Sequence, residues 1–317
     1  MNLSIVLPVY NVEPYLRECL DSIFKNNLSN FEVIAINDGS TDNSLEILEE
    51  YSGKYKNMKL INQQNMGLSV TRNVGLENSS GKYVYFFDSD DILVDGMDLS
   101  SFIDDVGNID IITFDADVFK DDISNHLQKV SNYKELYIDN TNTIFIKGIK
   151  TIKYSGIEYL NIIKTRNSYS PVVWRRIYKK EFLLENNALF YPGLIPAEDD
   201  LHFFQTLFLN PQIIHFREVV VLHRIRDTSI MSNLNRNKSY ESFNIIFREL
   251  LNMRALYSDS LLKQEVTSWI INVFVRRIHS QQPTLKEAIR LWGILKENNI
   301  RIELKTFIKL FINVVRG

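Results

Sequence analysis

Three carboxylates stand within four positions where a short apolar segment ends. The segment Tyr83–Phe87 is aromatic and β-branched, and Asp88, Asp90 and Asp91 come directly after it. Carboxylates crowded at the end of a buried strand repel one another, and a bound cation relieves that repulsion. Oxygen ligands suit Mg²⁺ or Mn²⁺, which keep several waters and bridge to phosphates. The spacing therefore predicts a metal–diphosphate site. The alternative is that Asp90 or Asp91 caps a helix starting near Ile92.

Three further strand-like segments also end in polar residues. They are residues 3–9 before Tyr10 and Asn11, 31–36 before Asn37 and Asp38, and 58–61 before Gln64 and Asn65. In a parallel α/β sheet, ligands bind beyond the carboxyl ends of the strands. We therefore expect all four polar clusters to converge on one edge of the sheet. Alone, the run Asn37-Asp38-Gly39-Ser40 would also be typical of an ordinary turn.

Helical spacing separates these strands. Between residues 12 and 24, the apolar positions recur at intervals of three and four, which predicts an amphipathic helix. Further helices are expected from about residue 42 to 55, with Asp42 or Ser44 as the cap, and from 67 to 76. Short buried strands alternating with helices predict an α/β fold with a largely parallel sheet covered on both faces.

The pattern loosens after residue 91. Strands are expected at 109–114, 143–147 and 213–222, an apolar stretch at 172–178, and a short helix at 198–209. Residues 121–142 are polar and predicted to be rich in loops. Four helices are expected near the C-terminus, at 240–257, 261–280, 285–298 and 304–315. We expect one large domain over 1–230, divided at residue 95, followed by a helical region over 231–317.

The overall composition is that of a globular protein, with 45% hydrophobic and 24% charged residues. A single cysteine, Cys19, excludes an internal disulfide and favours a reducing compartment. Its place on the apolar helix face indicates a structural role. No basic segment precedes an apolar one at the N-terminus, and no run reaches about 18 apolar residues. We therefore expect a cytoplasmic protein without a spanning helix.

Charge is distributed unevenly along the chain. Of 36 Lys+Arg and 39 Asp+Glu, residues 231–317 hold 14 and 7, so residues 1–230 hold 22 and 32. A basic region predicts an anionic partner. In 304–315, apolar residues are interleaved with Lys305 and Lys309, which favours peripheral contact with an anionic membrane. The alternative is that these helices cover the catalytic domain or form a homodimer contact. Nucleic acid is not expected, because no binding motif is present.

The motifs resemble those of the family 2 glycosyltransferases, which have the GT-A fold. The matching runs are residues 4–11, 37–42 and 65–69, then Arg72-Asn73, 83–91, Glu198-Asp199 and 226–230. Their order and spacing agree over about the first 95 residues. The resemblance implies a Rossmann-like, mostly parallel central sheet and inverting transfer from a UDP-sugar with Mn²⁺ or Mg²⁺. Thr71 departs from the pattern, since Ala is usual before Arg72-Asn73.

The resemblance also implies roles for individual residues. Asp199 would be the general base beside Glu198, with Asp200 as its competitor. Asp90 would ligate the metal with Asp91 in support, and His223 could be a further ligand or a packing residue. Asp38 would accept from the uracil N–H, and Arg72 would hold the base or the diphosphate. The other residues assigned to the nucleotide sugar are Pro8, Val9, Tyr10, Asn11, Asn65, Gly67, Asp88 and Ser89.

The chemistry fits these roles. A nucleotide diphosphate leaves without a protein acid, because a divalent cation neutralises the developing charge. The acceptor hydroxyl needs a carboxylate within about 3 Å to take its proton. Trp174 could stack on a sugar or lie in the core, and Arg175 and Arg176 could contact the diphosphate. The resemblance implies a saccharide acceptor on a lipid carrier. Two rival hypotheses are a non-catalytic assembly subunit and a glycoside hydrolase with paired carboxylates.

Overall fold

The computed structural model describes residues 1–26, 28–95, 99–120, 143–165, 168–194, 197–226, 236–258, 260–281 and 285–302. The chain divides into two compact units. The first comprises Met1–Gly193 and Glu198–Ser229, and the second comprises Leu194–Ala197 and Ile230–Gly317. Three of the sequence predictions, namely the loop at 121–142, the run 227–230 and the helix at 304–315, lie outside the described residues.

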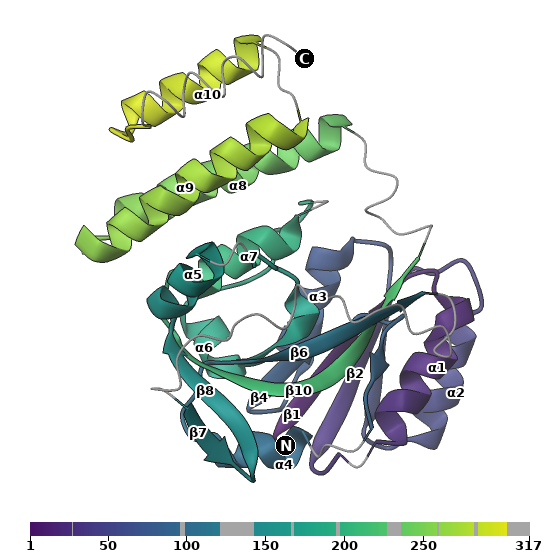
Figure 1. Cartoon of the computed structure of the whole chain (residues 1–317). Helices are drawn as coiled ribbons and strands as arrows, with labels where there is room; N and C mark the ends of the chain where they lie inside the picture. The colour runs from purple at the N-terminus through teal and green to yellow at the C-terminus, as the bar shows by residue number, and fades with distance from the viewer. Residues whose placement is uncertain are drawn as a thin grey trace. The chain divides into compact units, whose positions relative to one another are not determined.

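The N-terminal part of the first unit has the predicted alternation of strands and helices (Figure 1). Its elements are β1 (Leu3–Val9), α1 (Glu13–Phe24), β2 (Phe31–Asp38), α2 (Ser44–Lys54), β3 (Met58–Gln63), α3 (Leu68–Asn78) and β4 (Tyr83–Phe86). These four strands are parallel neighbours in the order β3-β2-β1-β4. The carboxyl ends of the strands therefore meet at one edge, as the sequence predicted.

A proline inside β1 is tolerated because of where its neighbour strand ends. The Val6 carbonyl accepts a hydrogen bond from the Phe87 N–H, and the last β1–β4 pair is Val6 with Phe86. Backbone groups in a strand alternate between its two sides, so Pro8 faces the same side as Val6, beyond that last pair. The missing N–H of Pro8 thus leaves no ladder bond unmade. β4 can end there and release Asp88 toward the sheet edge.

The remaining strands complete the sheet in mixed directions. They are β5 (Ile92–Leu93), β6 (Ile111–Lys120), β7 (Thr143–Ile146), β8 (Ile149–Ser155), β9 (Arg176–Lys179) and β10 (Gln212–Ile225). The full order is β3-β2-β1-β4-β9-β6-β10-β8-β7, with β5 paired to β10. β9 is antiparallel to both β4 and β6. The sheet is therefore largely parallel in its N-terminal half and mixed beyond β4.

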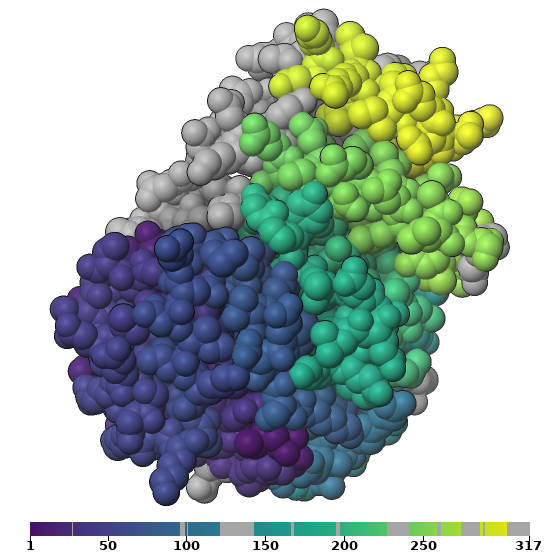
Figure 2. All heavy atoms as spheres, turned by 180° about the vertical axis from the view of Figure 1, so that it is seen from behind, coloured from purple at the N-terminus to yellow at the C-terminus, as the bar shows by residue number. Residues whose placement is uncertain are grey.

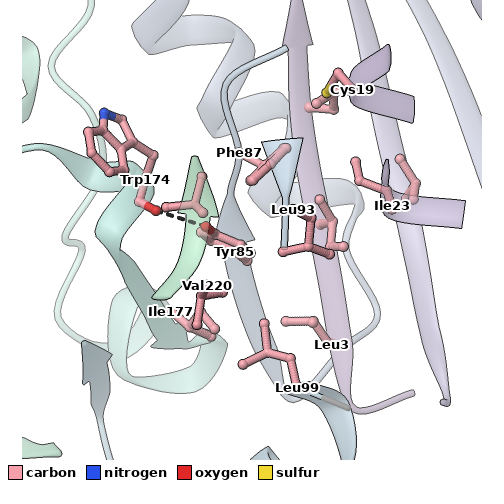
Figure 3. Close-up of a cluster of buried hydrophobic side chains, with 14 of the residues drawn as sticks. Leu3, Cys19, Ile23, Tyr85, Phe87, Leu93, Leu99, Trp174, Ile177 and Val220 are labelled. Atoms are coloured by element: carbon pink, nitrogen blue, oxygen red, sulfur yellow. Dashed lines mark hydrogen bonds between the residues drawn. The ribbon is translucent and has the colours of Figure 1, made fainter. Parts of the chain in front are cut away.

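Several short helices complete the first unit. They are α4 (Leu99–Asp105), α5 (Gly156–Thr165), a 3-10 helix at Val173–Arg175, α6 (Lys180–Glu185) and α7 (Glu198–Leu207). Of these, only α7 corresponds to a predicted helix, the one expected at 198–209. The space-filling view in Figure 2 shows the purple and blue N-terminal segments and the teal segments of this unit packed together without a break. One core therefore joins them: Figure 3 shows side chains from β1, α1, β4, β9 and β10 in a single buried cluster.

The second unit contains α8 (Arg236–Leu256), α9 (Ser260–Gln281) and α10 (Leu285–Glu297). The first two pack against each other, and Phe247 and Trp269 are buried. Arg254 ties the unit together, because it donates to the Thr267 hydroxyl at 2.7 Å and to the Asn298 carbonyl at 3.2 Å. The helices begin and end within about four residues of their predicted limits. Among the described residues, no helix is both long and apolar enough to cross a membrane.

Candidate active site

The run after β4 is brought against the end of β10 by strand pairing. β5 is antiparallel to β10, with Ile92 opposite Leu222, so Asp91 comes opposite His223. His223 Nδ1 lies 2.9 Å from Asp91 Oδ1, and the Arg224 N–H donates to the same oxygen at 2.9 Å. Two register shifts in the β6–β10 ladder precede this point. Such irregularities bend a strand and redirect its side chains, here toward the carboxylates.

One group of side chains could hold a divalent cation. Asp88, Asp91 and His223 each offer a ligand atom, and these atoms lie within 4.8 Å of one another. Two carboxylates and an imidazole suit Mn²⁺ and are compatible with Mg²⁺. The structure thus groups His223 with Asp88 and Asp91, and its role as a ligand stays a prediction. Asp90 lies outside the group, because its carboxylate is 2.6 Å from Arg226 Nε.

Burial and charge shift the pKa values of Asp91 and His223, which lie opposite each other. Burial raises the pKa of Asp91 to about 7, against the opposing effect of His223. Burial lowers the pKa of His223, but the charge of Asp91 outweighs it and raises that pKa to about 9. The charge of each side chain therefore affects the other, with Asp91 fully buried and the His223 side chain 28% exposed. A bound cation would replace the imidazolium proton as the charge that compensates Asp91.

Trp174 supports the imidazole of His223. The two rings are stacked with centroids 4.5 Å apart and planes at 13°, and Trp174 is 2% exposed. Its backbone carbonyl accepts a hydrogen bond from the Tyr85 hydroxyl at 2.9 Å, as Figure 3 shows. Of the two interpretations offered for Trp174, the structure favours the core residue. Because the indole packs on His223, it fixes the plane of that ring.

The neighbouring arginines are turned into the protein. Arg175 donates to the Phe114 carbonyl at 3.1 Å, and Arg176 donates to the carbonyls of Val172 and Ser170. Both side chains are buried. Arg176 thus holds the loop before the 3-10 helix, and Arg175 holds that helix against β6.

Arg72 is the central charge of the site. It is 2% exposed, and its two terminal nitrogens contact carboxylates from separate segments. Nη1 lies 2.7 Å from Asp199 Oδ1 and 3.7 Å from Glu198 Oε1, while Nη2 lies 3.1 Å from Asp88 Oδ1. One guanidinium thus joins the end of β4 to the start of α7. The sequence predicted all four residues as site residues, and the structure brings them together.

The predicted base has both oxygens engaged. Asp199 Oδ2 accepts the backbone N–H of Val173 at 3.0 Å while Oδ1 contacts Arg72. Burial raises the pKa of Asp199, and Arg72 opposes that rise. Burial and the charge of Asp199 also raise the pKa of Glu198 to about 7. Asp200 points elsewhere, since it accepts from the Tyr169 hydroxyl. Asp199 and Glu198, but not Asp200, therefore share the Arg72 cluster.

Asp38 holds its own loop. Its carboxylate accepts from the Gln63 side chain at 2.8 Å and from the backbone N–H groups of Met66 and Gly67 at 2.8 and 2.9 Å. Gly67 has φ 86°, a left-handed conformation that favours glycine, and it precedes α3. The predicted contact of Asp38 with uracil would use its remaining acceptor capacity. The observed contacts give Asp38 a role in shaping the loop at 64–67.

The other predicted nucleotide residues lie at the same edge with unequal exposure. Pro8 and Val9 are buried in β1, and Ser89 is 6% exposed. Tyr10 is half exposed, and Asn11 beside it accepts from the Thr41 N–H at 2.7 Å. Asn65 lies against Gly39, where a Cβ would come within 2.8 Å of the Asn65 nitrogen. Tyr10, Asn11 and Asn65 are the exposed members of this set.

Comparison with known proteins agrees with the geometry. Residues 4–156 match the sequence profile of Glycosyl transferase family 2. Residues 4–156 of this chain therefore form a family 2 glycosyltransferase domain. It is 28% identical over 268 residues to the uncharacterized glycosyltransferase YibD of Escherichia coli, covering 82% of this chain and 73% of that one.

Solved structures show that this family 2 protein has the GT-A fold. Residues 1–349 of S. aureus TarS in complex with UDP-GlcNAc superimpose with a TM-score of 0.67 and 23% identity, covering 99% of this chain and 79% of that one. The mannosyltransferase PcManGT of Pyrobaculum calidifontis, in complex with GDP-Man and Mn²⁺, gives a TM-score of 0.57 with 13% identity, covering 99% and 85%. The predicted α/β class and GT-A fold are thereby confirmed.

Proposed function

We propose that this glycosyltransferase moves a hexose or N-acetylhexosamine from a UDP-sugar to a hydroxyl of a glycan, with inversion at the anomeric carbon. One observation carries the proposal. Asp88 belongs both to the group Asp88–Asp91–His223 and to the Arg72 cluster that contains Asp199. Asp88 thus links the possible cation site to the carboxylate proposed as the base. The UDP-GlcNAc bound by TarS supports UDP as the nucleotide.

The residues present fit a divalent cation, which when bound would neutralise the charge of the departing diphosphate. Asp88, Asp91 and His223 would hold it, and Trp174 would keep the imidazole in its plane. Asp90 as a ligand stays a prediction, because Arg226 accounts for its carboxylate here. Tyr10 offers an exposed ring at the carboxyl end of β1 on which a base could stack.

The acceptor proton would go to Asp199. A carboxylate takes a proton from a hydroxyl in the transition state and contributes about 10²–10⁴ in rate. Arg72 and the Val173 N–H fix the direction of this carboxylate, which retains further lone pairs for the hydroxyl. Attack from the side opposite the diphosphate inverts the anomeric centre. No protein acid is required for the leaving group.

We further propose a lipid-linked saccharide acceptor of bacterial surface polysaccharide or lipo-oligosaccharide synthesis, which rests on the resemblance. The segment predicted to contact the membrane, 304–315, lies outside the described residues. The homodimer stays a prediction. The second unit contains a basic excess that suits an anionic surface. Binding of the whole chain to anionic vesicles, compared with a chain truncated after Gln282, tests this part.

Two alternatives make different predictions. A non-catalytic assembly subunit would bind the nucleotide sugar without turnover. A glycoside hydrolase would act without any nucleotide. The pairing of Asp199 with Arg72, and of Arg72 with Asp88, favours a base placed beside a donor site over either alternative. Incubating the protein with a panel of UDP-sugars, Mn²⁺ and glycan acceptors, and measuring UDP release, distinguishes the three.

The base assignment has a matched test. We expect Asp199→Asn to keep UDP–Mn²⁺ affinity and to lower turnover by about 10² or more. Asp200→Asn, which changes the adjacent carboxylate, should retain turnover within about tenfold because Asp200 contacts Tyr169 instead of Arg72. If Asp200→Asn is the inactive variant, the base has been placed one residue early.

The metal assignment is tested by calorimetry with UDP and Mn²⁺. His223→Gln removes an imidazole from the cation group, and Asp90→Asn removes a carboxylate outside it. We expect His223→Gln to weaken Mn²⁺-dependent UDP binding by 10-fold to 100-fold, by analogy with losses at metal sites. A larger loss in Asp90→Asn than in His223→Gln would show that Asp90, as the resemblance implies, is the main ligand.

A further inference from the structure

The guanidinium of Arg72, which contacts the proposed base, packs on an aromatic side chain that belongs to no motif. Phe190 lies in the segment between α6 and α7 and is 1% exposed. The centre of its ring is 5.1 Å from Cζ of Arg72. A guanidinium over an aromatic face is attracted by the ring quadrupole, with about 2 kcal/mol when both are removed from water. Phe190 therefore packs against the Arg72 guanidinium, which contacts both Asp199 and Asp88.

Phe190 is itself fixed by two backbone hydrogen bonds. The Asn73 side chain donates to the Phe190 carbonyl at 2.8 Å and accepts the Phe190 N–H at 2.9 Å. Asn73 follows Arg72 directly on α3, so the same helix turn carries the guanidinium and holds the Phe190 segment that packs against it. Such a paired amide contact fixes both position and orientation of the segment.

The far side of the Phe190 ring is closed by His202. Their centroids are 4.0 Å apart and the planes are within 7°. Burial, followed by the charges of Arg72 and Arg176, lowers the pKa of His202 to about 3. His202 is therefore neutral and adds no repulsion to Arg72. Because His202 lies three residues after Asp199 on α7, this stack joins the helix of the base to the ring beneath Arg72.

We propose that Phe190 and Asn73 are positioning residues, which fix the plane of the Arg72 guanidinium and thereby aim Asp199 at the acceptor hydroxyl. Each Nη of Arg72 contacts a different segment, so a tilt of the guanidinium moves the contact with Asp199 directly. A displacement of about 1 Å at a reacting group can lower a rate by about 10². This inference rests on the proposed role of Asp199 as the base.

The test is a double-mutant cycle between Phe190→Leu and Asp199→Asn, with kcat measured from UDP release at saturating donor and acceptor. Leu keeps the site apolar and removes the aromatic face. We expect Phe190→Leu to lower kcat by 10-fold to 100-fold, with donor KM and UDP–Mn²⁺ affinity within about threefold of wild type. In the Asp199→Asn background the same change should lower kcat by less than about twofold, because the carboxylate it aims is gone.

Phe102→Leu is the matched control. Phe102 is equally buried, on α4, and its ring packs on Phe216. The Phe102→Leu variant should lose as much free energy of unfolding as Phe190→Leu and keep kcat within about twofold of wild type. If Phe190→Leu does not fold, the same cycle is run with Asn73→Ala. This variant keeps the Phe190 and His202 side chains and removes only the two hydrogen bonds to the Phe190 backbone.

The outcomes separate this inference from the proposed function. Equal losses from Phe190→Leu in both backgrounds would overturn the positioning role, and so would a loss confined to UDP affinity. An active Asp199→Asn single variant would instead overturn the base assignment, whatever Phe190→Leu does.

Discussion

Gly75 is the position at which α3 approaches the sheet most closely, and alanine there should destabilise the protein. A Cβ at Gly75 would lie 2.1 Å from Val6 Cγ1 and 3.1 Å from Ile36 Cδ1. Ordinary contact begins at 3.4 Å, so α3 or β1 would have to move by roughly 1.3 Å. Val6 and Ile36 are completely buried and lie in central strands, which leaves them little room to turn away.

The magnitude follows from two opposing effects. Overfilling a packed core costs about 1–3 kcal/mol or more, and alanine is favoured over glycine within a helix by about 1 kcal/mol. We expect Gly75→Ala to lower the free energy of unfolding by about 2 kcal/mol, measured by urea denaturation. Because α3 carries Arg72 and Asn73, the same shift should also lower turnover.

Gly53→Ala is the matched control in a neighbouring helix. A Cβ at Gly53 in α2 meets nothing within 4 Å. Only the helix preference remains, so Gly53→Ala should raise the free energy of unfolding by about 0.5–1 kcal/mol. The two substitutions are chemically identical and are expected to have opposite signs. Equal stabilisation by both would refute the close packing of α3 on β1.

Two further predictions concern charged side chains of the site. The pKa of Glu198 is raised from 4.5 to about 7, so its stabilising effect is complete below about pH 4.5 and is lost as the pH rises through 7. Glu198→Gln should therefore match wild type in free energy of unfolding at pH 4 and exceed it by up to about 3 kcal/mol at pH 8, both measured by urea denaturation without metal or nucleotide. An equal difference between the two proteins at both pH values would contradict this. Asp38→Asn should lower the free energy of unfolding by about 1–3 kcal/mol, because it removes an acceptor from the amides of Met66 and Gly67. Unchanged stability would show that these bonds do not hold the loop.

The N-terminal half of the fold could be predicted because its signals are local. Strands of four to eight residues and helices of eleven or twelve alternate there, and each gives a clear period. The strand β7 was predicted at 143–147, but β8 and the turn that joins the two strands were missed although the turn has a local signal. Lys147 and Gly148 have φ values of 49° and 78°, as a two-residue hairpin turn requires. The helices α4 and α6, of seven and six residues, are too short to establish a helical period.

The site was predicted as a set of residues but not as a set of contacts. Arg72, Asp88, Glu198 and Asp199 all belong to motifs, whereas their pairing joins positions 127 residues apart in the chain. Phe190 belongs to no motif, and Arg226 was read only as part of a family match. The position of Asp91 opposite His223 depends on the register of β5 with β10, and β5 has only two residues. Such contacts follow from tertiary pairing and leave no period in the sequence.

The charges at the sheet edge favour the binding of a cation. Asp91 is compensated by His223 and Asp90 by Arg226, but Asp88, Glu198 and Asp199 share the single positive charge of Arg72. One guanidinium cannot neutralise three carboxylates, and the pKa of Glu198 is raised by burial and then by the charge of Asp199. A nucleotide diphosphate approaching Asp88 without a cation would add like charge to this excess. We therefore predict that donor binding at this edge depends on a divalent ion.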